Sequence, residues 1–117
     1  MDGIRDLDVV TALRRQMTIS AARQVASAGN LANAETPGYE AVEPTFADTL
    51  ASSVSDPGAL SVGVQPVPGL PARRDGNTVQ VDRELLTMGR AAGDFAAAQT
   101  ALAAKFRLVR YAINEGR

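Results

Sequence analysis

The sequence contains no cysteine and no histidine among its 117 residues. Their absence excludes disulfide bonds, thiolate nucleophiles and histidine general bases, and it removes the usual ligands of nearly every zinc or iron site. Carboxylates, hydroxyls, tyrosines and the single lysine, Lys105, are what remains for chemistry. We therefore expect no enzyme, no metal and no cofactor. Because the chain has no cysteine, its composition does not distinguish a reducing compartment such as the cytoplasm from an oxidising one such as the periplasm.

Aromatic residues are scarce, at 4%, and there is no excess of charge of either sign. The 12 basic and 13 acidic residues give a formal charge of -1, so no global field attracts the chain to nucleic acid or anionic lipid. The sequence also lacks a run of about 18 apolar residues, and it opens without a basic segment followed by an apolar one. We expect neither a membrane span nor a general secretory signal in this single domain's length of chain.

What the sequence does contain is helical periodicity at both ends. Near the N-terminus, apolar residues recur in steps of three or four, which predicts one stripe of an amphipathic helix within residues 1–36. The stripe comprises Leu7, Val10, Leu13, Met17, Ala21, Val25, Ala28 and Ala32. Pro37 disfavours helical geometry for Thr36, so we expect the helix to end there. Pro37-Gly38 then predicts a type II turn.

The C-terminal segment, residues 82–117, has a longer apolar series whose steps alternate between three and four. This heptad pattern predicts left-handed coiled-coil packing. Its members are Leu85, Met88, Ala92, Phe95, Gln99, Leu102, Phe106, Val109 and Ile113. Gln99 alone interrupts it, and Asp82 is the expected N-cap. The two helices have similar lengths, which favours an antiparallel hairpin.

The middle segment, residues 37–81, holds all six prolines. A short helix is expected over about 44–54, with Phe46, Leu50 and Val54 on one face, followed by an extended loop over residues 55–74. Asp75-Gly76-Asn77 predicts a turn, and residues 78–81 are a candidate strand. The expected fold is mainly α: two long terminal helices forming a coiled-coil-like hairpin around a proline-rich, mostly irregular middle.

Candidate chemical groups have simpler structural interpretations. Glu35, Glu40 and Glu43 lack histidine or cysteine partners, which favours solvated charges over acid-base or metal chemistry. Basic residues near the end of the last helix are explained by the helix dipole. An isolated hairpin with an alanine-rich face buries little apolar area, so burial against other subunits is favoured over a stable monomer.

Two blocks of sequence carry a resemblance to a known family. Residues 30–39, Asn-Leu-Ala-Asn-Ala-Glu-Thr-Pro-Gly-Tyr, are similar to the signature that flagellar rod, hook and hook-filament junction proteins carry near their N-termini. The matching positions are Asn30, Leu31, Ala32, Asn33, Thr36, Pro37, Gly38 and Tyr39. A second block, residues 74–84, together with the short length, resembles the proximal rod members in particular. Gly29 departs from the family, where serine, alanine or asparagine is common.

The resemblance implies a structural subunit of the flagellar basal body that polymerises through its terminal helices. It further implies passage through the flagellar type III export gate and a place in the periplasmic rod, beside other copies, the rod proteins FlgC and FlgF, and the small adaptor FliE. Phe46 and Leu50 fit the Phe-x-x-x-apolar pattern of early export substrates, although packing explains the same pair. A soluble helical adaptor that binds one partner remains the alternative of a different class.

Overall fold

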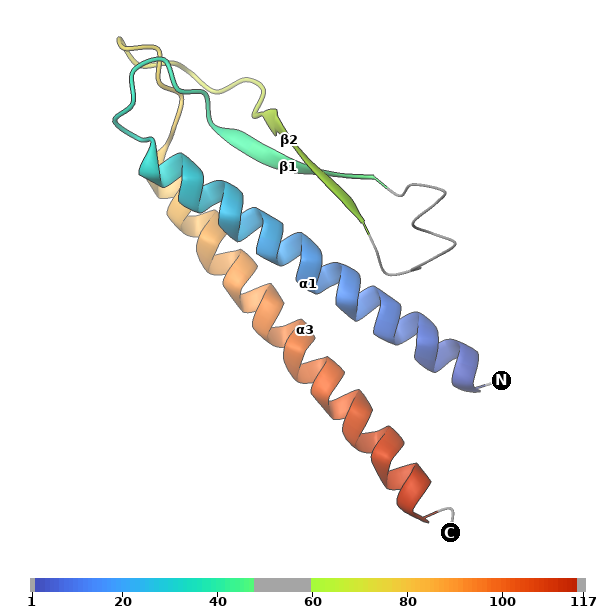
Figure 1. Cartoon of the computed structure of the whole chain (residues 1–117). Helices are drawn as coiled ribbons and strands as arrows, with labels where there is room; N and C mark the ends of the chain where they lie inside the picture. The colour runs from blue at the N-terminus through green and yellow to red at the C-terminus, as the bar shows by residue number, and fades with distance from the viewer. Residues whose placement is uncertain (1, 48–59, 116–117) are drawn as a thin grey trace.

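The computed structural model describes residues 2–47 and 60–115. The chain is mainly helical. Helix α1 (Asp2–Ala32) and helix α3 (Val81–Glu115) run side by side in opposite directions, with both chain ends at the same end of the molecule (Figure 1). Strands β1 (Val42–Ala47) and β2 (Ser61–Pro66) form a small antiparallel sheet beside α1. The molecule is elongated, with extents of 69 × 29 × 18 Å. The prediction of two long terminal helices is confirmed.

Helix α1 ends at Ala32, four residues earlier than the proline rule predicts. After Gly29 the backbone tightens: the amide of Ala34 donates to Leu31 and that of Thr36 donates to Asn33, both three residues back. The side chain of Asn33 also donates to the carbonyl of Gly29 at 2.9 Å. These local hydrogen bonds satisfy the carbonyl groups at the end of the helix, so the helix ends before the backbone reaches Pro37.

The two helices meet through small residues. Ser20 and Ser27 of α1 are buried, and they lie seven residues apart. On α3, Ala91 and Ala98 are buried with the same spacing. Small side chains at these positions allow the helix axes to approach closely over the half of the hairpin nearest the sheet. A seven-residue spacing is therefore present, and its most buried positions are serine and alanine rather than large apolar side chains.

Every second position of the buried stripe of α3 lies one residue earlier than the sequence predicts. Met88, Phe95 and Leu102 are half-buried and belong to the predicted series. The buried positions that alternate with them are Glu84, Ala91 and Ala98, where the series has Leu85, Ala92 and Gln99. One residue rotates a helix by about 100°. Pattern recognition weights large apolar residues, and in an alanine-rich segment it missed the small residues that make the contact.

Helix α3 also begins slightly earlier than expected. Its first residue is Val81, and the carbonyl of Gln80 accepts a hydrogen bond from the amide of Glu84 at 3.0 Å. Gln80 therefore occupies the cap position, and the prediction of Asp82 as N-cap is wrong by two residues. Asp82 lies in the first turn, where its charge still complements the helix dipole.

The middle segment differs most from expectation. Residues 44–47 are part of β1 rather than of a helix, and residues 48–54 of the predicted helix lie outside the described residues. Within the predicted loop, residues 61–66 form β2. The register pairs Val42 with Pro66 and Ala47 with Ser61. The predicted strand at residues 78–81 is wrong: residues 78–80 are irregular and Val81 opens α3.

Candidate functional site

The two sequence blocks meet at the end of the hairpin opposite the chain termini. Residues 33–41, which follow α1, lie against residues 72–80, which precede α3 (Figure 1). Four side chains bond to the backbone of a segment far away in the sequence, and we call them the clasp: Asn30, Arg73, Asn77 and Thr78.

Asn77 is the centre of the clasp and is fully buried. Its Nδ2 donates to the carbonyls of Asn33, Ala34 and Thr36 at 2.9, 3.1 and 2.8 Å. Its Oδ1 accepts the amide of Val79 at 2.8 Å. One side chain thereby binds the carbonyl groups that follow the end of α1 and also fixes the approach to α3, which couples the two helices at this end.

Arg73 and Thr78 add bonds between the same two segments. The guanidinium of Arg73 donates through Nη1 to the carbonyl of Val79 at 2.8 Å and through Nη2 to the carbonyl of Ala34. The hydroxyl of Thr78 accepts the amide of Ala41 at 2.8 Å. The backbone amide of Thr78 donates to the carbonyl of Tyr39 at 3.0 Å. Both side chains therefore fix backbone geometry in the clasp.

Asn30 ties α1 to the sheet. Its Nδ2 donates to the carbonyl of Val42 at 2.9 Å, and its Oδ1 accepts the amide of Val42 at 3.0 Å. The phenol of Tyr39 donates to the same Oδ1 at 3.2 Å. The side-chain amide of Asn30 thus pairs with Val42 as a neighbouring strand would, although it comes from a helix.

Two glycine turns bring the blocks together. The Pro37-Gly38 turn is confirmed as type II: the amide of Tyr39 donates to Thr36 at 3.2 Å, and Gly38 has φ of 75°. In the second block, Gly76 has φ of 84°. A Cβ on Gly76 would meet the Cα of Gly38 at 3.3 Å, and the amide of Gly38 donates to Asp75 at 2.7 Å. The turns touch each other. Their close approach leaves little room for a side chain at Gly76, whereas Gly38 is favoured by its positive φ.

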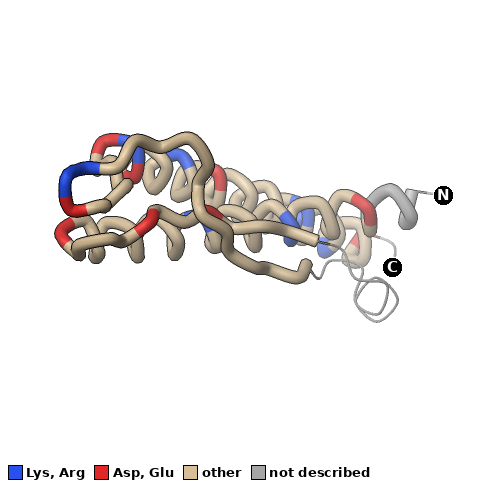
Figure 2. Tube along the Cα trace, turned by 90° about the horizontal axis from the view of Figure 1, so that it is seen from above, with Lys and Arg blue, Asp and Glu red and all other residues tan. Residues whose placement is uncertain are grey.

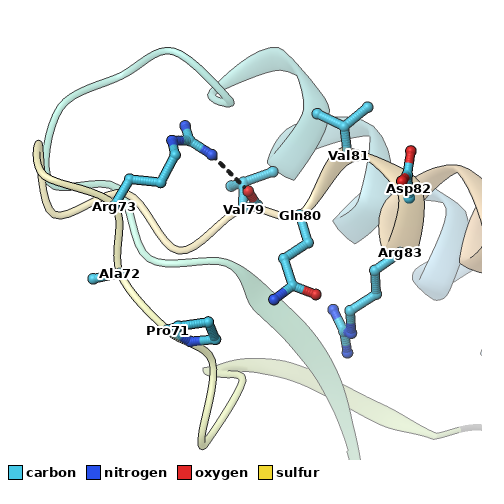
Figure 3. A pocket seen from close by; sticks show the side chains of 8 residues that line it. All are labelled: Pro71, Ala72, Arg73, Val79, Gln80, Val81, Asp82 and Arg83. Carbon is cyan, nitrogen blue, oxygen red and sulfur yellow. Dashed lines mark hydrogen bonds between the residues drawn. The ribbon is translucent and has the colours of Figure 1, made fainter.

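A small apolar core lies beneath these turns. Ala34, Ala41 and Val79 are buried, with Tyr39, Val67 and Leu70 packed around them. None of these residues was singled out from the sequence as a core position. Beside this core, a hollow of about 500 Å³ opens to solvent, and Arg73 and Arg83 line it with the residues labelled in Figure 3. Arg73 donates to two carbonyls and Arg83 to the buried carboxylate of Glu84 at 2.9 Å.

The described residues offer no metal site, because no three acidic side chains among them converge. Of the three glutamates considered from the sequence, Glu43 accepts a hydrogen bond from Gln65 across the sheet at 2.9 Å, and Glu35 and Glu40 are exposed. Figure 2 shows acidic and basic residues interspersed along the molecule. The polar side chains of the clasp bond to backbone groups, so the hydrogen bonds given for them stabilise the fold.

A second feature of functional interest is the apolar surface that the hairpin leaves uncovered. Phe106, Val109 and Ile113 on α3 are 56%, 41% and 65% exposed, and Leu85 is 55% exposed. Ala92 and Gln99, between them, are exposed as well. Leu108 and Tyr111, each 67% exposed, lie on a different face of the same part of the helix. We call Phe106, Leu108, Val109, Tyr111 and Ile113 the distal α3 surface.

On α1, the predicted stripe divides in the same way. Leu13 and Met17 are half-buried, whereas Val25 is 73% exposed and Leu7 65% exposed. Val25 therefore lies outside the contact within the hairpin, which Ser20 and Ser27 mark, and its place in a seam between subunits stays a prediction. Both helices keep apolar residues on surfaces that nothing in the described chain covers.

The candidate export pair is placed only in part. Phe46 lies in β1, half-buried and opposite Val62. Leu50 lies outside the described residues. The short helix expected at Phe46 is wrong, since that residue belongs to a strand, and the choice between export and packing stays a prediction.

Comparison with known proteins identifies no relative: the chain matches no protein-family model and has no significant match among curated proteins. In the part of the chain that the structure describes, neither helix has the length of apolar sequence that crossing a bilayer requires.

Proposed function

We propose that the chain is a structural subunit of the proximal rod of the bacterial flagellum, of the FlgB type, which polymerises through its two terminal helices. In this proposal the helices pack as a coiled-coil-like hairpin that joins those of neighbouring subunits. The subunit has no catalytic role. FlgC, the sibling rod protein with the same first signature, is the second identity within this class.

The observation that carries the proposal is the distal α3 surface. Five large apolar side chains, each at least 41% exposed, occupy the last third of a helix in a chain with few large apolar residues. Phe106, Val109 and Ile113 share one face of this helix, and an exposed apolar face of this kind marks contacts with other proteins. A subunit whose helices bundle with those of its neighbours requires such a surface.

The clasp supports the same function in a second way. The residues of the family signature, Asn30 through Tyr39, are occupied with backbone bonds and turns, so the signature preserves geometry rather than chemistry. A subunit that is added repeatedly to a growing tube needs its two helices held at one fixed angle. Asn77 and Arg73 hold them at the end remote from the exposed surface.

In this proposal the chain leaves the cytoplasm by the flagellar type III pathway and assembles in the periplasm with other copies, FlgC, FlgF and FliE. Phe46 and Leu50 would engage the export gate before folding. In an unfolded chain during export, Phe46 is exposed and free of Val62.

The alternative is a soluble adaptor whose α3 surface binds one partner helix. The same exposed side chains favour it, because a single helix laid along Phe106, Val109 and Ile113 would cover them. Growth distinguishes the two: a rod subunit forms assemblies that extend with concentration, whereas an adaptor forms a complex of fixed stoichiometry.

The test is deletion of the encoding gene followed by motility measurement and electron microscopy of purified basal bodies. We expect non-motile cells whose basal bodies lack a rod, and recovery of both when the gene is restored. Cells that swim and carry complete rods without the chain would exclude the proposal. Restoration by a variant with Phe106→Asp would exclude the α3 surface as the contact.

A further inference from the structure

The two edges of the β1–β2 sheet are unequal. In an antiparallel pair, residues alternate between those that bond to the partner strand and those whose N–H and C=O point outward. The backbone N–H and C=O of Val42 point away from β2, because both groups bond to the side chain of Asn30. Ala41, the residue before Val42, faces the other way: its carbonyl accepts a hydrogen bond from the amide of Val67, which follows β2, at 2.9 Å.

The outer edge of β1 is therefore closed. Val42 is occupied by Asn30, and the next outward residue, Pro44, has no N–H. Only Phe46 could still offer both groups. This combination of a side chain that imitates a strand and a proline on the edge is a common protection against further strand pairing.

The outer edge of β2 has no partner strand among the residues that the structure describes. By the register, Val62, Val64 and Pro66 are its outward residues, opposite Phe46, Pro44 and Val42. All six residues of β2 are exposed, and none of them is charged. Val62 and Val64 are 47% and 68% exposed. No charged residue protects β2, and its one proline, Pro66, is its last residue, which leaves Val62 and Val64 with both backbone groups available.

The sequence of β2 is complementary to itself. In an antiparallel pair of two β2 strands centred on Gly63, Val62 of each copy stands opposite Val64 of the other, and both positions point outward. Four backbone hydrogen bonds and two valine pairs result. The central pair is Gly63 with Gly63, at the narrow position where Cα atoms approach to about 4.5 Å and side chains crowd most.

We propose that the open edge of β2 is a self-association site, at which two copies of the chain pair antiparallel about Gly63 into one four-stranded sheet. The closed β1 edges stop the sheet at four strands, so the product is a dimer rather than a fibre. A two-fold pair has no place in a one-directional tube, so this contact belongs to the unassembled chain and does not depend on the proposed rod function.

The test uses the absence of cysteine from the chain. Two variants, Val62→Cys and Val64→Cys, are purified separately, and disulfide formation under mild oxidation is compared for each alone and for their mixture. In the proposed register residues 62 and 64 of different copies have Cα atoms about 5.5 Å apart, within the range that a disulfide bridges. We expect crosslinked dimer in the mixture and little in either variant alone.

Sedimentation of the cysteine-free chain provides the second arm. Val64→Pro removes one outward N–H and should lower the dimer fraction, while the matched control Val64→Thr keeps that N–H and should not. A chain that is monomeric at every concentration, equal crosslinking in all three samples, or a dimer abolished by Phe106→Asp but insensitive to Val64→Pro would each overturn the proposal. The last of these outcomes would assign association to the distal α3 surface.

Discussion

Replacing Asn77 with alanine should loosen the clasp as a unit. The carbonyls of Asn33, Ala34 and Thr36 lose the Asn77 donor, but each keeps another partner: the amide of Thr36, the guanidinium of Arg73 and the amide of Tyr39, respectively. The main cost therefore falls on the buried amide of Val79, which loses Oδ1 of Asn77. An unsatisfied buried donor and the missing packing together cost about 3 kcal/mol.

Amide hydrogen exchange measures this loss locally. The amides of Val42 and Thr78 are suitable reporters, because their acceptors are Asn30 and Tyr39 and the substitution touches neither bond directly. If the clasp opens cooperatively, both amides should exchange roughly a hundredfold faster in Asn77→Ala, which corresponds to about 3 kcal/mol. The control is Thr36→Ala, which removes an exposed hydroxyl bond to Asn33 and should change exchange by less than about 0.5 kcal/mol.

Retained protection of Val42 and Thr78 in Asn77→Ala, with faster exchange at Val79 alone, would contradict cooperative opening of the clasp. The clasp would then be a set of independent bonds, and the coupling of the two helices would have to come from the Ser20–Ala98 region alone. Circular dichroism of both variants verifies that the helices are retained.

Three further predictions follow from other parts of the molecule. Phe106→Asp should leave expression intact but abolish rod assembly, because a buried unpaired carboxylate costs several kcal/mol, and soft-agar swarming at the parental rate would contradict this. Phe46→Ala should keep the subunit in the cytoplasmic fraction of a strain unable to complete the rod, whereas accumulation in the periplasm would exclude the export role. Gly76→Ala should destabilise the clasp by about 1–2 kcal/mol because of its positive φ and the nearby Gly38, and an unchanged urea midpoint would argue against this strain.

The purified chain should also contain less helix than the assembled protein, because the exposed residues of the distal α3 surface give that end of the hairpin little burial. Circular dichroism of the dilute chain and of assembled material compares the two. Cooperative melting of a fully helical monomer would contradict the expectation.

How far the sequence predicts this structure depends on the signal that each element carries. The helices and the Pro37-Gly38 turn follow from local rules of periodicity and backbone geometry, which act within a few residues. The face of α3 that meets α1 does not follow from local rules. Ala91 and Ala98 are buried there because they are small, and in an alanine-rich segment the hydrophobic pattern does not distinguish them from exposed alanines.

The sheet and the clasp depend on contacts between distant residues. Val42–Ala47 contains Pro44, and Pro44 lowers any strand prediction; it is tolerated because it lies on an outer edge. From the sequence, Asn77 is an ordinary turn residue after Asp75-Gly76. It binds the carbonyl groups after α1 only because the fold places the end of α1 beside it. A signal for the clasp was present in the sequence: each family-like block contains an asparagine, Asn30 and Asn77, and a turn exposed to solvent does not need an asparagine at either position.

We propose that other subunits in the flagellar rod cover the helical surfaces that are exposed in the single chain. Electron cryomicroscopy of intact basal bodies, at a resolution that shows side chains, tests it most directly. We predict density for this chain at the base of the rod, with Phe106, Val109 and Ile113 buried against helices of neighbouring subunits. A resolved rod that contains no copy of the chain, or one in which these three side chains face solvent, would contradict the account.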